Sequence, residues 1–246
     1  MPIQILQLES TTSDGVVLKS YVCLPESASH DNPAPAILVA PEWWGAAAHP
    51  QKVTERLAEA GFAAVAMDVY GEGKLTTDAA QANEWMSQML ADQDMLMARC
   101  KLIMDDFTDL EAVDKNRLGA IGFCFGGKIV LDMAREGFPL KAVATFHGNP
   151  DPKQPAQKGK FTAKVLVAHG EADSMVSMDA IEGLKKELDN ADVEYTVDVY
   201  EGAKHGFTNP NADKRAEENG VDLGYDADAA KASWDKMIAF MRDNLV

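Results

Sequence analysis

Cysteine is scarce in this chain, with three residues in 246. So few cysteines do not build a disulfide framework, and none of them forms the C-x-x-C pair that is typical of zinc sites. We therefore expect no metal site and a reducing, cytoplasmic compartment. The sequence also contains no run of about 18 apolar residues, which argues against a membrane helix. Its first residues, MPIQILQLES, lack the basic start and apolar core of a signal peptide.

The chain also contains few positively charged residues relative to acidic ones. Lysine and arginine number 23 against 39 aspartates and glutamates, which gives a formal net charge of −16 at pH 7. Proteins that bind nucleic acid or anionic membranes need a basic face, so we expect neither partner. The hydrophobic share of 46% is ordinary for a globular protein. We expect a monomer or small homo-oligomer whose ligand is a small molecule.

The chain shows no repeat, low-complexity block or linker, which predicts one domain over residues 1–246. Its first two apolar segments, IQILQLES and GVVLKSYVCLP, are typical of an antiparallel pair with a turn at residues 13–15. Buried strand patterns then alternate with helical patterns, which predicts an α/β fold with a mostly parallel central sheet and helices on both faces. Residues 78–107 form a methionine-rich helical pattern, which we interpret as core packing rather than an adaptable pocket wall.

A cysteine follows one of the predicted strands, in the stretch GAIGFCFGGKIV of residues 119–130. Gly122-Phe123-Cys124-Phe125-Gly126 has the G-x-nucleophile-x-G form of a nucleophile elbow, a tight turn from strand to helix in which the flanking positions must be small. The N-terminus of the following helix would favour the thiolate form of the cysteine. The alternative is a buried, inert cysteine beside packing glycines.

The groups that would activate this thiol follow in chain order. Asp173 comes after the predicted strand KVLVAHG, 49 positions past Cys124, and His205 comes after YTVDVYEG, a further 32 positions on. Both therefore emerge at the carboxyl end of a strand, on the same edge as the elbow. Histidine can take the thiol proton while a carboxylate orients the ring. Glu171 is a competing acid, but it lies closer to the strand and is more typical of a turn.

The other histidines have simpler interpretations. His169 is expected to be a structural residue at a strand end. His147 would either touch substrate or, as we prefer, stabilise a loop. His30 and His49 are expected at the surface. None of these residues has a convincing metal-ligand spacing with a carboxylate.

An oxyanion hole would complete such a site. One donor is expected to be the backbone N–H of Phe125, directly after the nucleophile, and the other that of Trp43 in the loop after an earlier strand. Glu42 precedes that loop at the end of a buried strand, where an unpaired acid is costly. Its carboxylate would bond to neighbouring backbone or face the thiol.

Four stretches, ILVAPEWWG, GFCFGG, HGEAD and KHGFTNP, together resemble the dienelactone hydrolase family, the cysteine-dependent branch of the α/β-hydrolase fold. The resemblance extends over nearly the whole chain. It implies a triad of Cys124, His205 and Asp173 that hydrolyses an ester or enol-lactone through an acyl-enzyme, without a cofactor. It also implies that Glu42 holds the resting thiol by a hydrogen bond, protecting it from oxidation until substrate binds.

The sequence departs from the family at the group that recognises the substrate carboxylate. The best-studied type uses two arginines there, but residues 58–97 contain no arginine and only Lys74, and no cation directly follows His205. Lys204 and Arg215 are the available replacements, although exposed cations are more often only solvated. The expected pocket is apolar and aromatic, with the following residues: Trp43, Trp44, Tyr70, Trp85 and Phe207.

These observations predict a carboxylic ester hydrolase of the dienelactone hydrolase type. The missing arginines favour a broad carboxylesterase or thioesterase as the alternative enzyme. A different class is a catalytically silent binding protein or a redox sensor that uses Cys124 as a reactive thiol. The intact acid and histidine weigh against a sensor, which would not need both.

Overall fold

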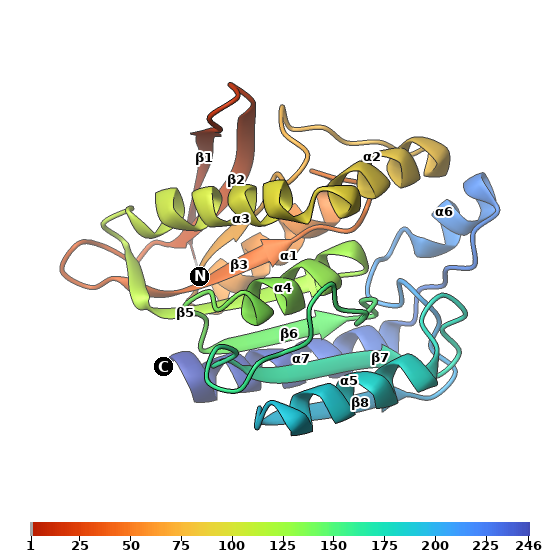
Figure 1. Cartoon of the computed structure of the whole chain (residues 1–246). Coiled ribbons are helices and arrows are strands. Elements are labelled where there is room, and N and C mark those ends of the chain that lie inside the picture. The colour runs from red at the N-terminus through yellow and green to blue at the C-terminus, as the bar shows by residue number, and fades with distance from the viewer. Residues whose placement is uncertain (1) are drawn as a thin grey trace. The chain divides into compact units, whose positions relative to one another are not determined.

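The computed structural model describes residues 2–246, in which helices alternate with strands along most of the chain (Figure 1). The chain divides into two compact units, residues 2–120 with 245–246, and residues 121–244. Strand β5 (Val113–Phe123) runs from the first unit into the second. The expectation of a single domain stays a prediction. Within residues 2–246, no helix is both long and apolar enough to span a bilayer.

The first unit orders its strands β1-β2-β4-β3-β5. Strands β1 and β2 are antiparallel, and Thr11 faces Val17 across the turn, so the predicted N-terminal pair is confirmed. Strand β4 is antiparallel to β2 and parallel to β3. The bounds are β1 (Ile3–Thr11), β2 (Val17–Pro25), β3 (Ala34–Ala40), α1 (Ala48–Glu59), β4 (Ala63–Ala66), α2 (Ala79–Ala91) and α3 (Gln93–Thr108).

The core of the first unit lies around strand β3. Every residue of this strand is buried, as its unbroken apolar run predicted. Helix α1 packs against β2, β3 and β4 and buries Val53 and Leu57. The end of β3, from which Glu42 and Trp43 follow, is therefore held between neighbouring strands and a helix.

The methionine-rich segment forms two helices rather than one. The break is at Asp92, whose φ of −123° and ψ of 75° lie outside the helical region. Its side chain accepts a hydrogen bond of 3.0 Å from the backbone N–H of Met95 and so caps the second helix. Met89, Met97 and Met104 are buried, which supports the interpretation that these side chains pack in the core.

The second unit contains the parallel strands β6, β7 and β8. Strand β7 pairs with β6 on one side and β8 on the other, and α4 packs against β6. The bounds are α4 (Phe125–Arg135), β6 (Ala142–Phe146), β7 (Lys164–Gly170), α5 (Met178–Asn190), β8 (Tyr195–Tyr200), α6 (Ala212–Asn219) and α7 (Ala227–Leu245).

Parallel pairing decides where the polar loops of the second unit leave the sheet. Strands β7 and β8 run in the same direction, with Gly170 opposite Tyr200. The segments that carry Asp173 and His205 therefore both begin at the carboxyl edge of these strands. The strands of the first unit pair in a mixed arrangement and those of the second unit are parallel, with helices packed against both sets, which confirms the predicted α/β fold class.

Candidate active site

Cys124 occupies a strained turn between β5 and α4. Its φ of 54° and ψ of −115° are rare for a residue with a side chain. A Cβ atom added at Gly122 would lie 2.0 Å from the carbonyl oxygen of Gly126, so the turn closes only with glycine there. Cys124 is partly exposed, whereas Cys23 and Cys100 are buried. This turn therefore has the close packing of a nucleophile elbow and presents its thiol.

Asp173 and His205 lie together beside strands β7 and β8. Nδ1 of His205 is 2.9 Å from Oδ2 of Asp173, and both side chains are almost completely buried. Oδ1 of the carboxylate accepts the backbone N–H groups of Met175 and Val176, each at 2.9 Å. Burial by itself would raise the pKa of Asp173, but the His205 contact and the two amides lower it below its ordinary value. The carboxylate is thus ionised and held in one orientation.

Two neighbouring side chains raise the pKa of His205. Burial of the ring favours the neutral form, but the electrostatic influence of Cys124 and the hydrogen bond that the ring donates to Asp173 outweigh it and raise the pKa to about 10. Nε2 has no aligned hydrogen-bond partner within the described part of the chain. Cys124 still lies close enough to raise the pKa of the ring through its charge and through a hydrogen bond, and catalytic hydrogen bonds are often poorly aligned before substrate binds.

The competing residues of the same region take other roles. Glu171 is exposed and accepts the backbone N–H of Gly202 at 3.2 Å, so the acid that contacts His205 is Asp173. His169 is 1% exposed at the end of β7, and burial lowers its pKa. A neutral, buried ring agrees with the expectation of a structural histidine.

His147 lies in contact with the elbow. Its Nδ1 is 3.2 Å from the backbone nitrogen of Cys124, and its Nε2 is 3.0 Å from Oγ1 of Thr208. The ring also stands 4.9 Å from that of His205, centroid to centroid, in an edge-on arrangement. The sequence predicted His147 only as a residue that stabilises a loop or touches substrate, and its contact with the nucleophile was not predicted.

In the first unit, the side chain of Glu42 lies beside that of His49. Oε2 of Glu42 is 3.3 Å from Nδ1 of His49, and their side chains are 6% and 8% exposed. The expectation that His49 lies at the surface is therefore wrong, because the start of helix α1 turns its ring toward the end of β3. His30 is exposed as expected.

The aromatic residues expected to line a pocket occupy different surroundings. The rings of Trp43 and Trp44 are 5.0 Å apart, and the backbone oxygen of Trp43 accepts a hydrogen bond of 3.0 Å from the hydroxyl of Tyr70. Trp44 is 2% exposed. Phe207 is completely buried, and its ring stands 5.4 Å from that of His147. Any part these buried rings play in substrate binding stays a prediction.

Tyr70 and Trp85 share a cavity of about 250 Å³, with their rings 5.5 Å apart. Arg99 of helix α3 borders the same cavity, is 6% exposed, and donates from Nη1 to the backbone oxygens of Val69 and Tyr70 at 2.9 Å each. Lys74 also lines it. Arg99 was not predicted from sequence, because it lies just past residues 58–97, the stretch without arginine. No local pattern marks this residue, because the carbonyls that it contacts lie 30 and 29 positions earlier in the chain.

The family model described as the dienelactone hydrolase family matches residues 18–245. The chain belongs to the dienelactone hydrolase family. As a member it is a hydrolase with the α/β-hydrolase fold, which confirms the predicted enzyme class.

Solved and curated relatives agree with this membership. The crystal structure of a dienelactone hydrolase-like promiscuous phosphotriesterase from metagenomic libraries has a TM-score of 0.92 and 30% identity, and it covers 100% of both chains. A Yersinia pestis protein named as a candidate carboxymethylenebutenolidase is 28% identical over 238 residues, 92% of this chain and 84% of that protein. The dienelactone hydrolase of Anabaena variabilis, 18% identical with a TM-score of 0.70, shares the fold.

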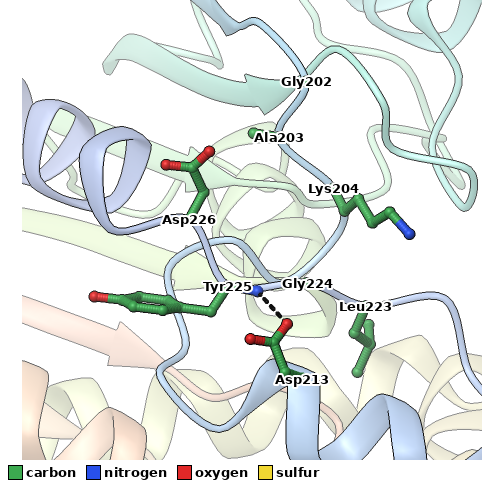
Figure 2. Close-up of a pocket in the computed structure, with 8 residues that line it drawn as sticks. All are labelled: Gly202, Ala203, Lys204, Asp213, Leu223, Gly224, Tyr225 and Asp226. Carbon is green, nitrogen blue, oxygen red and sulfur yellow. Dashed lines mark hydrogen bonds between the residues drawn. The ribbon is translucent and has the colours of Figure 1, made fainter.

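The cations considered as replacements for the family's arginines are neutralised. Nζ of Lys204 is 2.8 Å from Oδ1 of Asp222. Figure 2 shows the cavity of about 270 Å³ that Lys204 borders, which Asp213 and Asp226 also line. Arg215 lies 3.6 Å from a glutamate one turn along helix α6. An anionic substrate group would gain little from either cation.

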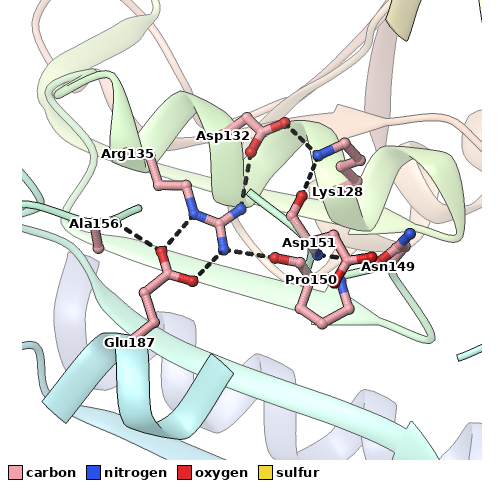
Figure 3. A network of polar contacts seen from close by, with 8 residues as sticks. All are labelled: Lys128, Asp132, Arg135, Asn149, Pro150, Asp151, Ala156 and Glu187. Atoms are coloured by element: carbon pink, nitrogen blue, oxygen red, sulfur yellow. Dashed lines mark hydrogen bonds and ion pairs between the residues drawn. The ribbon is translucent and has the colours of Figure 1, made fainter. Parts of the chain in front are cut away.

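A buried network of charges holds the helix that follows the nucleophile. In Figure 3, Arg135 of α4 pairs with Asp132 at 2.8 Å and, through Nε and Nη2, with both oxygens of Glu187 in α5, also at 2.8 Å. Nη2 further donates to the backbone oxygen of Pro150, and Lys128 lies 3.0 Å from Asp132. The guanidinium therefore donates four hydrogen bonds, which tie α4 to α5 and to the loop after β6.

Replacing Arg135 with methionine should destabilise the protein by about 3–5 kcal/mol, because Asp132 and Glu187 would stay buried without their shared cation. Urea unfolding monitored by circular dichroism measures the difference. Lys158→Met is the matched control, since Lys158 pairs with Asp192 where both side chains are about three-quarters exposed, and almost no change is expected. Equal stability of the two variants would contradict a structural role for the network.

Among residues 2–246, no cluster of three or more histidine, cysteine or acidic side chains is arranged to hold a metal ion. A thiol, an imidazole and a carboxylate lie near one another instead. These three groups come from the loops after β5, β7 and β8, all in the second unit.

Proposed function

We propose that this hydrolase cleaves a carboxylic ester or lactone, with Cys124 as nucleophile, His205 as proton carrier and Asp173 as the group that orients the ring. The observation that carries the proposal is the buried 2.9 Å contact between Asp173 and His205, on a ring whose pKa Cys124 raises. A thiolate beside an imidazolium is the activated form of a cysteine nucleophile. The strained elbow presents that sulfur at the start of α4.

In the first half of the reaction, the sulfur of Cys124 attacks the substrate carbonyl carbon, and the carbonyl π electrons move to oxygen. The intermediate then reforms the carbonyl and breaks the ester C–O bond, and Nε2 of His205 gives its proton to the leaving oxygen. The products of this half are an acyl-thioester and an alcohol, or a ring-opened hydroxyl if the substrate is a lactone.

In the second half, a water molecule attacks the thioester while Nε2 of His205 takes one of its protons. Breaking the C–S bond releases the carboxylic acid and restores the thiolate and the imidazolium. Asp173 keeps Nδ1 of His205 protonated throughout, so that Nε2 alone exchanges protons with the reacting atoms. Neither half requires a cofactor.

The negatively charged oxygen of each tetrahedral intermediate needs hydrogen-bond donors to stabilise it. Phe125 is the first residue of helix α4, and we propose its backbone N–H as one of them, because first-turn amides of a helix point outward with partial positive charge. The donor role of Trp43 and the gating role of Glu42 stay predictions from sequence.

Phosphotriester hydrolysis is a second candidate activity. The observation that favours it is the 30% identity, over the whole length of both chains, to a protein whose title names it a promiscuous phosphotriesterase. The sulfur of Cys124 would attack phosphorus and expel one alkoxide, which takes a proton from His205, and water would then cleave the P–S bond to release the phosphodiester. We propose carboxylic esters as the better substrates and phosphotriesters as a slower side reaction.

A panel of substrates tests both candidates on the full chain. It contains p-nitrophenyl acetate, a thioester, an enol-lactone and a p-nitrophenyl phosphotriester, each followed by product release. We expect many turnovers of at least one carboxylic substrate and, after acid quench, an acyl adduct on Cys124 detected by mass spectrometry. Alkylation of Cys124 without turnover of any substrate would indicate a thiol sensor and overturn the proposed function.

A further inference from the structure

The backbone position of His147 is fixed by burial, by a hydrogen bond to a neighbouring strand and by close packing next to it. It follows β6 with a φ of 42°, a left-handed conformation that is uncommon for a residue other than glycine, and it is 1% exposed. Its backbone N–H donates to the carbonyl oxygen of Ala168 in β7 at 2.9 Å. The neighbouring Gly148 packs on Gly127 of α4, since a Cβ at Gly148 would lie 2.7 Å from Cα of Gly127. A residue kept in a strained backbone by such packing has little freedom to move.

The hydrogen-bond partners decide the protonation of the His147 ring. The backbone nitrogen of Cys124 can only donate, so Nδ1 of His147, 3.2 Å away, must be the unprotonated acceptor. The proton of the neutral ring is then on Nε2, which donates to Oγ1 of Thr208 at 3.0 Å. The same elbow N–H also reaches the carbonyl oxygen of Phe146 at 3.0 Å, so it is shared between two acceptors.

These two bonds connect the nucleophile with the loop of the catalytic base. Cys124 carries the attacking sulfur, and Thr208 lies three positions after His205 in the chain. The edge-on contact between the rings of His147 and His205, 4.9 Å between centroids, adds a third link. One imidazole therefore touches the backbone of the nucleophile, the ring of the base and the loop that carries the base.

We propose that His147 is a positioning residue: a neutral imidazole that sets the separation between the sulfur of Cys124 and the ring of His205. The inference rests on the proposed function for these two groups. Small displacements of reacting groups are costly, because a shift of about 1 Å can lower a rate by about 10²-fold. Cys124 is already in a strained conformation, so a second acceptor on its N–H helps to keep the elbow from relaxing.

Substituting His147 with asparagine or glutamine tests its hydrogen bonds to Cys124 and Thr208 one at a time. The amide oxygen of asparagine reaches the position of Nδ1 and can still accept from the N–H of Cys124, and asparagine tolerates a positive φ better than most residues. The amide of glutamine reaches the position of Nε2 and can bond to Thr208 but not to the elbow. Leucine fills similar space and makes neither bond.

The test compares wild type with H147N, H147Q and H147L, using p-nitrophenyl acetate turnover and thermal melting of the full chain. We expect kcat to fall about 10²-fold in H147L and H147Q, to recover at least about tenfold in H147N, and KM to change little. Thr208→Val, which removes only the second bond, should have the smaller effect. A purely structural role would lower the melting temperature without this order of kcat values.

The rate at which iodoacetamide alkylates Cys124 in the same variants provides a readout that does not need turnover. We expect the same order, with H147N closest to wild type. If wild type turns over no ester, the proposed function fails, and the alkylation order alone then decides the inference. H147Q equal to or faster than H147N in both assays, or a folded H147L with wild-type kcat and alkylation rate, would overturn it. If H147L does not fold, the comparison of H147N with H147Q is still decisive.

Discussion

Replacing Cys124 with alanine should lower kcat for ester hydrolysis by about 10⁴-fold or more, because the acyl-thioester cannot form without the sulfur. The elbow should survive this change, since the turn depends on the close approach of Gly122 to Gly126 rather than on the thiol. Steady-state release of p-nitrophenolate measures the loss. Circular dichroism shows whether the variant is folded.

Cys23→Ala is the matched control for this experiment. Burial raises the pKa of the Cys23 thiol to about 11, which keeps it protonated and unreactive at neutral pH. The control should keep wild-type kcat even where it lowers stability by leaving a small cavity. Activity that survives in Cys124→Ala but is lost in Cys23→Ala would contradict the assignment of the nucleophile.

The Cys124→Ala variant should also change the titration of His205. Cys124 is the largest of the influences that raise the pKa of this ring to about 10, so its removal should move the pKa downward. Nuclear magnetic resonance of the imidazole signals against pH measures the shift directly. An unchanged titration would mean that the sulfur and the ring do not interact.

Replacing Asp173 with asparagine should lower kcat by about 10³-fold, because a neutral amide neither stabilises the imidazolium nor holds Nδ1 protonated. The bonds from Met175 and Val176 can still be accepted by the amide oxygen, so the loop should keep its conformation. The same ester assay measures the effect. Glu171→Gln, a change of an exposed acid two positions away, is the control and should stay near wild type.

The stability of the pair between Asp173 and His205 depends on pH in two directions. The pKa of Asp173 is lowered, so its contribution is present above about pH 4 and is lost as pH falls through the folded-state value. The pKa of His205 is raised, so its contribution is complete below about pH 6.5 and is lost as pH rises toward 10. The difference in unfolding free energy between wild type and Asp173→Asn should therefore be largest between these limits and shrink on either side.

Urea unfolding at a series of pH values measures this difference. A gap between wild type and variant that does not depend on pH would mean that the two side chains are not linked through their charges. Glu171→Gln should show no such dependence, because Glu171 is exposed and contacts only the backbone N–H of Gly202 among the hydrogen bonds described above.

Much of the candidate site could be predicted from local sequence. Elbow glycines are required within two positions of the nucleophile, so Gly122, Cys124 and Gly126 form a recognisable pattern by themselves. Asp173 and His205 follow apolar strand runs directly, and parallel strands bring their carboxyl ends to one edge. The fold class follows from the same alternation of strands and helices.

Other features had no local signal. Asp92 ends one helix and caps the next through a bond to Met95, whereas the apolar periodicity around it continues as if one helix were present. The burial of His49 depends on how the start of helix α1 is oriented relative to the end of strand β3. In sequence Arg99 is an ordinary helical arginine. Only the fold brings the backbone carbonyls of Val69 and Tyr70 within hydrogen-bonding distance of its guanidinium.

Residue types and spacing along the chain were enough to locate the thiol, the imidazole and the carboxylate, because strand ends and tight turns impose short-range rules. The sequence favoured Asp173 over Glu171, and three-dimensional packing then put Asp173 against His205 and placed His147 between the elbow and Thr208. Two residues far apart in sequence become hydrogen-bond partners only if the fold points their side chains toward each other. Those directions depend on how every neighbouring strand and helix packs, which no single stretch of residues encodes.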